Sequence, residues 1–385
     1  MTDAISIRKG TSRLRDPELA AAELFAALDQ PDIQLVVFYC AADFDLPALA
    51  KALHSRFHTI NIVGCTTAGE ITPQGYLAGA LTGFSLAAPT VDVAMQAIPL
   101  DPFDSVSTGT TVTALIKQLG SRNGLPPGAT DTFAFLLIDG LAMQEELVVS
   151  CIHQQLQGID MIGGSAADDT RFAATYVYHN GQFRQNIAVL TLVRSDLPFV
   201  AFRTQHFTRS NKRMVVTRAD PAKRLVFEIN GRPAGREFAR LVDLNLTELT
   251  PQIFATHPVV VRVGGQYFVR SIGMVNPDES LTFFCAIDEG IVLTIAKGVD
   301  MVENLEQAFD EVRAKLGEPL LVLGCDCVLR RLETEREDIK DRIGAIFAAN
   351  NVVGFATYGE QFNSMHVNQT FTGIAIGRRA SDAGN

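Results

Sequence analysis

One pattern occurs three times along the chain, and it constrains the fold more than any other feature of the sequence. In each copy an apolar run is followed by a helix-like stretch, after which a second apolar pair leads into glycine. Because a buried strand, a crossover helix and a second strand form a βαβ unit, each copy predicts a pair of parallel strands. The copies occupy residues 35–64, 133–164 and 320–354.

The first and third copies match each other more closely than either matches the second. Each continues with Val-Gly, threonine, glycine and glutamate at the same spacing, in residues 63–70 and 353–360. A solenoid would need a short repeat period, so this likeness predicts two related halves.

Tight-turn signals lie between the other strand-like runs. Asn-Gly and Gly-Gly supply the positive φ values that two-residue hairpin turns require. The predicted fold is therefore α/β, with two related βαβ-containing halves and an antiparallel β meander added in the C-terminal half. The turn signals are Asn180-Gly181, Asn230-Gly231, Gly264-Gly265 and Asn276-Pro277-Asp278.

The length of 385 residues predicts two domains, because a chain this long rarely forms a single core. Residues 207–224 are rich in arginine, lysine and aspartate, which is typical either of a domain boundary or of a solvated strand pair. With the boundary in this stretch, the expected domains are residues 1–210 and 211–385.

Charge and hydropathy exclude several classes of partner. The net charge of −10 argues against binding to nucleic acid or to an anionic membrane. The best apolar run, residues 291–296, is too short to span a membrane, and residues 1–17 lack the apolar core of a signal peptide. Several of the six cysteines lie in apolar runs, where a reduced thiol acts as a small hydrophobe. We therefore expect a cytoplasmic protein without membrane insertion.

Signatures of common enzymes are missing from the sequence. It has no Walker-type phosphate loop, no glycine-rich dinucleotide fingerprint, no His-Glu-x-x-His motif and no Gly-x-Ser-x-Gly elbow. The best support for catalysis is Glu70, Asp168, Asp169 and Glu360 near predicted strand ends, but carboxylates are also common at caps and turns. The expectation is that the chain is not an enzyme.

Two residue pairs resemble metal ligands at first sight. Cys325 and Cys327 are separated by one residue, whereas structural zinc needs wider spacing and a second pair, so a strand-end turn is favoured. His54 and His58 share one face of a predicted helix without a third ligand, which favours a surface helix.

Three other histidines are candidate ligand residues. His206 ends the alternating run 200–206 and lies on a partly apolar strand face, which suits either an axial iron ligand or a satisfied strand histidine. His257 precedes Pro258 at the start of an apolar strand, and it is either a second candidate iron ligand or a histidine at a strand entry. His366 follows the end of a predicted βαβ strand, where open α/β sheets bind ligands, and shares a strand face with Asn368.

Arginines on the predicted strands are candidates to hold carboxylates such as haem propionates. The guanidinium group donates two parallel hydrogen bonds, which match a carboxylate. Solvent-exposed strand arginines are the commoner alternative. The candidates are Arg203, Arg209, Arg262 and Arg270.

Three segments carry a family resemblance that covers nearly the whole chain. Residues 63–71 (VGCTTAGEI) resemble the hallmark of the N-terminal FIST domain, and residues 353–360 (VGFATYGE) resemble that of the C-terminal FIST domain. Residues 228–234 (EINGRPA) resemble the segment that opens the second domain. The resemblance implies a sensory module of prokaryotic signalling whose ligand is a small molecule.

A narrower resemblance links the chain to the NosP group of FIST proteins. It is carried by residues 269–272, 281–290 and 359–366. It implies a cofactor, haem b, and a function, nitric-oxide sensing. The partners that it implies are a histidine kinase or a diguanylate cyclase or phosphodiesterase, and a homodimer is compatible with it. The sequence has no kinase or cyclase signature, so we expect the signal to reach a separate chain.

With this resemblance, the expected haem-iron ligand is His206, with His257 as second choice, and the expected cofactor-binding arginines are Arg203, Arg262 and Arg270. Nitric oxide would act by shifting a two-state equilibrium, with loss of the His–Fe bond as one trigger. The alternative is a haem-free FIST sensor for an amino acid or other small metabolite, with the two Gly-Glu loops as its pocket floor.

Overall fold

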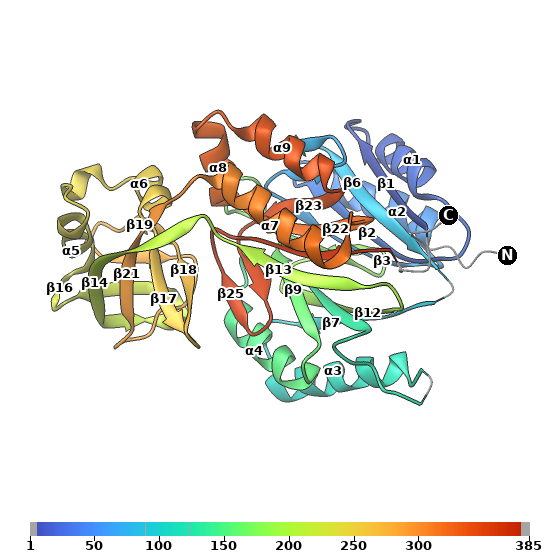
Figure 1. Cartoon of the computed structure of the whole chain (residues 1–385), viewed down its shortest axis with the longest axis horizontal. Helices are drawn as coiled ribbons and strands as arrows, with labels where there is room; N and C mark the ends of the chain where they lie inside the picture. Colours follow the sequence, from blue (N-terminus) through green and yellow to red (C-terminus); the bar gives the residue numbers. More distant parts are fainter. Residues whose placement is uncertain (1–5, 89, 123, 379–385) are drawn as a thin grey trace.

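The computed structural model describes residues 6–88, 90–122 and 124–378, and the outermost residues of both expected domains lie outside these ranges. Its framework is one unit repeated three times (Figure 1). In each unit an edge strand and a helix precede a βαβ element. A short hairpin and a closing antiparallel strand follow it.

The first two units are continuous in the chain. The first comprises β1 (Ser6–Ser12), α1 (Pro17–Leu28), β2 (Ile33–Ala41), α2 (Leu46–Phe57), β3 (Asn61–Thr67), β4 (Glu70–Thr72), β5 (Gly75–Leu77) and β6 (Leu81–Ala87). The second comprises β7 (Val91–Pro99), α3 (Ser105–Leu119), β8 (Thr132–Ile138), α4 (Glu145–Leu156), β9 (Asp160–Ser165), β10 (Val177–His179), β11 (Gln182–Arg184) and β12 (Ile187–Ser195).

The third unit is interrupted by an insertion after its edge strand. The unit comprises β13 (Phe199–Thr204), α7 (Met301–Leu316), β22 (Leu321–Cys327), α8 (Val328–Arg336), α9 (Lys340–Ala349), β23 (Val352–Thr357), β24 (Glu360–Phe362), β25 (Met365–Val367) and β26 (Phe371–Ile376). The insertion comprises β14 (Phe207–Asp220), β15 (Leu225–Ile229), β16 (Arg232–Pro233), α5 (Ala234–Leu241), α6 (Pro251–Thr256), β17 (Val259–Val263), β18 (Gln266–Arg270), β19 (Ile272–Val275), β20 (Leu281–Phe283) and β21 (Val292–Gly298).

Aspartate begins four of the outer helices. The side chains of Asp16, Asp45, Asp104 and Asp300 each accept a hydrogen bond from a first-turn amide, at the starts of α1, α2, α3 and α7. An N-cap of this kind satisfies amides that have no partner within the helix. Local sequence therefore sets where these helices begin.

The three predicted βαβ units are confirmed. Strands β2 and β3, β8 and β9, and β22 and β23 are parallel pairs. Each sheet is covered by its own helices on one face and meets the other two sheets on the opposite face. Because these strands are buried on both faces, they appear in the sequence as continuous apolar runs.

Each unit passes its hairpin to the sheet of another unit. Hairpin β4–β5 of the first unit pairs with β23 of the third, and β24–β25 of the third pairs with β9 of the second. Hairpin β10–β11 of the second unit pairs with β3 of the first and completes the cycle. The result is three six-stranded sheets, none of which is made by one unit alone.

The central core is formed where the three sheets meet. Its only stacked ring pair in the described residues joins two sheets, with Tyr39 and Phe355 at a centroid distance of 4.6 Å. Its buried members come from all three units and include Val37, Val63, Phe135, Ile162, Leu323 and Phe355.

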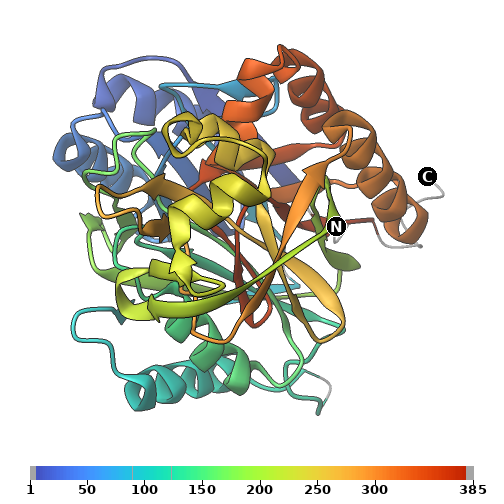
Figure 2. The same cartoon turned by 90° about the vertical axis from the view of Figure 1, so that its left-hand side faces the viewer.

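The insertion is an antiparallel, nearly closed barrel that carries its own core (Figure 1). The predicted α/β class and the added meander are thus confirmed. Figure 2 shows the barrel, in yellow and orange, in front of the three units. Val367 of β25 packs in the barrel core, so the hairpin of the third unit joins the barrel to the second unit's sheet.

The expected boundary between residues 210 and 211 falls inside β14. The chain enters the barrel just before this point, since β13 belongs to the third sheet. In the described part of the chain, no helix is both long and apolar enough to cross a membrane.

Gly75 provides a test of the exchanged hairpins. Its φ is +104°, and a Cβ atom there would lie 3.1 Å from the backbone of Gly344 in α9. We expect Gly75→Ala to lower the free energy of unfolding by about 2 kcal/mol more than Gly124→Ala, because overpacking adds to the backbone strain. Gly124 is the control, since its φ is also positive, at +77°, but a Cβ atom added there would meet no other atom within 4 Å. Urea unfolding measures both, and equal losses would contradict close packing of the β4–β5 turn on α9.

Candidate functional site

The two glutamates of the repeated motif are buried where β3 and β23 lead into their hairpins. The Thr67 hydroxyl donates to Glu70 Oε1 at 2.6 Å, and the Ala80 amide donates to Oε2 at 2.9 Å. Burial raises the pKa of Glu70 to about 7. The carboxyl group lines a pocket of about 340 Å³, although both of its oxygens already have internal donors.

Glu360 has the corresponding arrangement in the third unit. The Thr357 hydroxyl donates to Oε1 at 3.0 Å, and the Thr370 amide and hydroxyl donate to Oε2 at 3.1 and 2.7 Å. Burial raises the pKa of Glu360 to about 8. Both glutamates therefore fasten the start of a hairpin to the chain just before its closing strand.

The two aspartates also make internal contacts. Asp168 accepts hydrogen bonds from the amides of residues 172–174, each at 2.9 Å, and from the Tyr358 hydroxyl. Asp169 pairs with Arg331 at 3.1 Å. The carboxylates that the sequence offered for catalysis are thus held in separate turns and ion pairs.

His206 lies in a buried ion cluster with Asp326, Arg330 and Glu333. Its Nε2 lies 3.0 Å from Glu333 Oε2, and its Nδ1 lies 2.8 Å from Arg330 Nη1, which can only donate. Arg330 Nε also donates to Asp326 at 2.7 Å. Burial lowers the pKa of His206, which agrees with a neutral ring that donates from Nε2 and accepts at Nδ1. Both ring nitrogens therefore already have partners.

The ion cluster stands where the chain enters and leaves the barrel. His206 directly precedes β14, and its carbonyl accepts a hydrogen bond of 2.8 Å from the Val299 amide, which directly follows β21. The cluster thus ties both connections of the barrel to helix α8.

His257 and Arg262 lie elsewhere on the barrel. His257 Nδ1 lies 3.0 Å from the Thr256 hydroxyl, and the half-buried ring lines a pocket of about 570 Å³ with Lys212 and Ile295. Arg262 is exposed, and its guanidinium lies 6.0 Å from the centre of the Tyr267 ring.

Arg203 and Arg270 lie together at the seam between the barrel and the three units. Arg203 lies over the Phe268 ring at 4.3 Å and within 5.7 Å of the Phe362 ring centre, and its Nη1 is buried without a hydrogen-bond partner. Burial, and then the charge of Arg270, lowers the pKa of Arg203 to about 10. In the described part of the chain, no carboxylate pairs with either guanidinium.

Buried polar atoms without partners in the described part of the chain lie on hairpin β24–β25 and in the loop after it, and Arg270 contacts the backbone of this hairpin. Arg270 Nη1 donates to the His366 carbonyl at 2.8 Å, while His366 Nε2 has no hydrogen-bond partner among the residues that the structure describes. Gln361 Nε2 lies 3.3 Å from His366 Nδ1, but Gln361 Oε1 and the side-chain amide of Asn368 are unpaired. We call Arg203, Arg270, Gln361, His366 and Asn368 the seam cluster. Unpaired buried polar groups cost about 1–3 kcal/mol each, so such a cluster is suited to a ligand or ordered water.

The structure places no metal site at the other histidine and cysteine pairs. The rings of His54 and His58 lie 6.4 Å apart, and both Cys325 and Cys327 are buried as free thiols. Within residues 6–88, 90–122 and 124–378, no group of three or more metal-binding side chains occurs.

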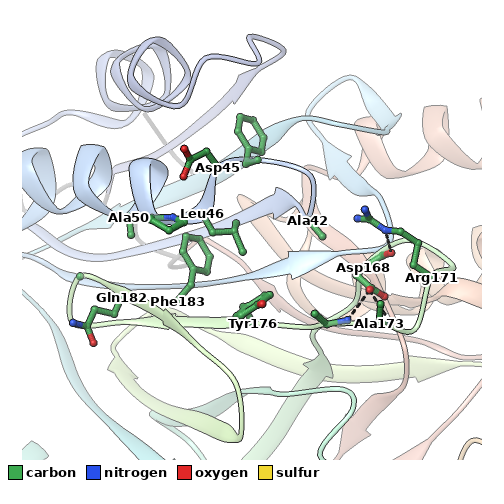
Figure 3. Close-up of a pocket in the computed structure, with 14 residues that line it drawn as sticks. Ala42, Asp45, Leu46, Ala50, Asp168, Arg171, Ala173, Tyr176, Gln182 and Phe183 are labelled. Atoms are coloured by element: carbon green, nitrogen blue, oxygen red, sulfur yellow. Dashed lines mark hydrogen bonds between the residues drawn. The ribbon is translucent and has the colours of Figure 1, made fainter.

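An apolar crevice opens beside the first unit, at the end of β2. It has a volume of about 750 Å³ and is lined by residues of α2 and β11, by the loop between β2 and α2, and by the loop between β9 and β10 (Figure 3). None of the predicted histidines or arginines lines it.

The predicted site residues therefore do not form a single site. Arg203 and Arg270 meet in the seam cluster, His206 lies in the ion cluster, and His257 and Arg262 lie apart from both. Sequence reasoning missed Gln361 as a member of the seam cluster. The sequence did contain a signal for this residue, because many polar side chains occur in residues 361–370, between two runs that form buried strands.

Comparison with known proteins matches residues 34–232 to the FIST N domain and residues 234–363 to the FIST C domain. The chain is 23% identical over 354 residues to an uncharacterized protein of Methanocaldococcus jannaschii, a match that covers 82% of this chain and 67% of that protein. Two solved structures align with 97% of this chain at a TM-score of 0.22. They are T. maritima PurL complexed with FGAR, at 11% identity over 73% of that chain, and phosphoribosylformylglycinamidine synthase II from Thermotoga maritima, at 7% over 72%. Scores this low do not relate the folds.

The buried glutamates make the free energy of unfolding depend on pH. The folded-state pKa of Glu360, about 8, lies above the ordinary value of 4.5, so between these pH values the folded protein retains a proton that the unfolded chain has released. Raising the pH from 5 to 8 should therefore reduce the stability of the wild type relative to Glu360→Gln, by up to about 1.4 kcal/mol per pH unit. Urea unfolding across this range measures the difference. The exposed Glu306→Gln is the control, and a difference that stays constant with pH would contradict a buried, protonated Glu360.

Proposed function

The chain belongs to the FIST family, and we propose that it senses a small ligand and passes the signal to a separate protein. FIST domains are sensory domains for small ligands in signalling proteins. We propose that the protein binds its ligand and does not catalyse a reaction. It is supported by the carboxylates at Glu70, Asp168, Asp169 and Glu360, each of which already has internal partners.

We place the ligand at the seam cluster. The observation that carries this proposal is a pair of guanidinium groups, Arg203 and Arg270, that have no carboxylate partner among the described residues of an acidic chain. Two neighbouring positive charges repel each other, and the repulsion is stronger where water is partly excluded. A ligand carboxylate would remove it by accepting hydrogen bonds from both arginines.

The other members of the seam cluster complete the ligand-binding chemistry. The Asn368 amide offers donors and an acceptor, and Gln361 Oε1 offers an acceptor. His366 Nε2 offers either a donor or an acceptor, depending on its tautomer. A small metabolite with a carboxylate and a second polar group matches this set of atoms.

A haem-based nitric-oxide sensor is the second candidate. The site residues that the sequence favoured do not fit haem, because both ring nitrogens of His206 are hydrogen-bonded and His257 lies apart from Arg203 and Arg270. The seam cluster offers more of the chemistry that haem needs, since the two arginines suit propionates and His366 Nε2 has no partner in the described part of the chain. Haem b bound there would supply an iron atom that binds nitric oxide.

Arginine variants test the carboxylate proposal. We expect a carboxylate metabolite, found by thermal-shift screening, to stabilise the wild type by about 2.7 kcal/mol at one hundred times its Kd. Arg203→Met and Arg270→Met should each weaken binding by at least about tenfold, because they remove the charge and keep most of the side-chain volume. The exposed Arg262→Met is the matched control and should bind as the wild type does. A ligand that binds all four proteins equally would place the site elsewhere.

Visible spectra of haem-loaded protein separate the two candidates. With a metabolite as the ligand, we expect no stoichiometric Soret band in the wild type. A Soret band that shifts with nitric oxide and disappears in His366→Ala, but remains in His206→Ala and His257→Ala, would assign haem to the seam cluster instead.

A further inference from the structure

The three units share one topologically equivalent place, between the end of the first parallel strand and the start of the helix that follows it. Ligands in open α/β sheets bind outside the carboxyl ends of strands, where such crevices form. In the second unit this place is filled by Arg224, whose Nη2 lies 2.6 Å from Glu145 and 3.1 Å from Glu146 at the start of α4.

The equivalent place in the third unit is also filled by side chains of this chain. Asp326, at the end of β22, accepts from Arg330 of α8 and from the Tyr76 hydroxyl of the first unit's hairpin. Arg330 and Asp326 are fully buried. The protein's own polar groups thus occupy two of the three equivalent places.

The equivalent place in the first unit is an open crevice, with a volume of about 750 Å³. Pockets of about 300–1,000 Å³ are typical of small-molecule sites. Figure 3 shows the Tyr176 and Phe183 rings beneath α2, from which Leu46 and Ala50 also line the crevice. Phe44 is another apolar residue that lines the crevice. The first turn of α2 has no acidic residue at the place where α4 has Glu145 and Glu146, and the carboxylates that line this crevice are Asp45 and Asp168.

Polar groups at the rim indicate the charge of the occupant. Arg171 has its guanidinium directed toward Ala42 at one end of the crevice (Figure 3). Its Nε donates to the Asp168 carbonyl at 3.0 Å, but in the described part of the chain its guanidinium has no carboxylate partner. The Asp168 carboxylate is already satisfied by backbone amides, and Asp45 caps α2. Arg171 is therefore the rim charge available to a ligand.

We propose that this crevice is a second ligand site, separate from the seam cluster, and that it binds an aromatic acid. The ring lies between Phe44, Tyr176 and Phe183, and the anionic group meets Arg171. Burial of the ring supplies most of the affinity, because the lining is mainly apolar, and Arg171 selects the acid over its neutral analogue.

Two fluorescent probes of similar ring size test the proposal. 8-Anilinonaphthalene-1-sulfonate carries an anionic group, whereas N-phenyl-1-naphthylamine has the same rings without it. We expect both to bind the wild type, and Arg171→Gln to weaken the sulfonate about tenfold while changing the neutral probe less than about twofold. Ala50→Phe should remove binding of both probes, because the new ring fills the crevice.

Controls separate this site from the other surface hollows. A groove of about 900 Å³ between α3 and α4 is lined by Ala114 and Lys117, so Ala114→Phe and Lys117→Gln are the matched variants and should leave both probes unaffected. If Ala50→Phe does not fold, as judged by thermal melting, Ala173→Phe repeats the test from the exposed side of the crevice.

Two results would overturn the proposal. Retention of both probes by the crevice-filling variant would place their binding elsewhere. An equal loss of both probes in Arg171→Gln would show that Arg171 acts through structure and not through charge. Neither result bears on the seam cluster, which is tested with the Arg203 and Arg270 variants.

Discussion

Backbone hydrogen bonding between a hairpin of one unit and the sheet of another is the interaction on which the rest of the structure depends. An unpaired edge strand exposes amides and carbonyls that need partners. Here Ile71 pairs with Gly354, Gln361 with Gly163, and Tyr178 with Gly64, so each sheet gains its outer strands from a different unit. The exchange is cyclic, which means that no unit completes its sheet alone. Glu70 and Glu360 secure two of the crossing points from inside the protein.

The same exchange creates the polar interior of the seam. The third hairpin leaves its own sheet, pairs with β9 and packs against the barrel through Val367. Gln361 and His366 are carried into the interior with it, at 0% and 2% exposure. On an exposed hairpin these side chains would be solvated by water. Buried on the hairpin whose backbone Arg270 contacts, they form a set of donors and acceptors that a ligand can satisfy.

Both chain connections to the barrel lie at one place, and that place is next to the seam. Arg203 of the seam cluster and His206 of the ion cluster lie on the same short stretch of chain leading into the barrel. His206 is held by Arg330 and Glu333 of α8, so the position of the barrel is tied to the third unit by buried charges. Breaking such a cluster by removing one partner is costly, because it leaves a buried charge uncompensated. A ligand at Arg203 therefore acts within a few residues of the point where the chain enters the barrel.

The sequence by itself determined the three βαβ units, the added antiparallel meander and the family, because apolar periodicity, turn residues and the Val-Gly…Thr-x-Gly-Glu motifs are local signals. It also identified Arg203, Arg270 and His366 as candidates for binding. Only the tertiary structure decided which residues meet. His206 and His366 both lie in or beside strands of mixed polarity, yet one has both ring nitrogens satisfied by α8 and the other has an unpaired Nε2. The partners of each histidine lie far from it in the chain. The exchange of hairpins depends on backbone pairing between distant segments, and local periodicity does not encode such pairing.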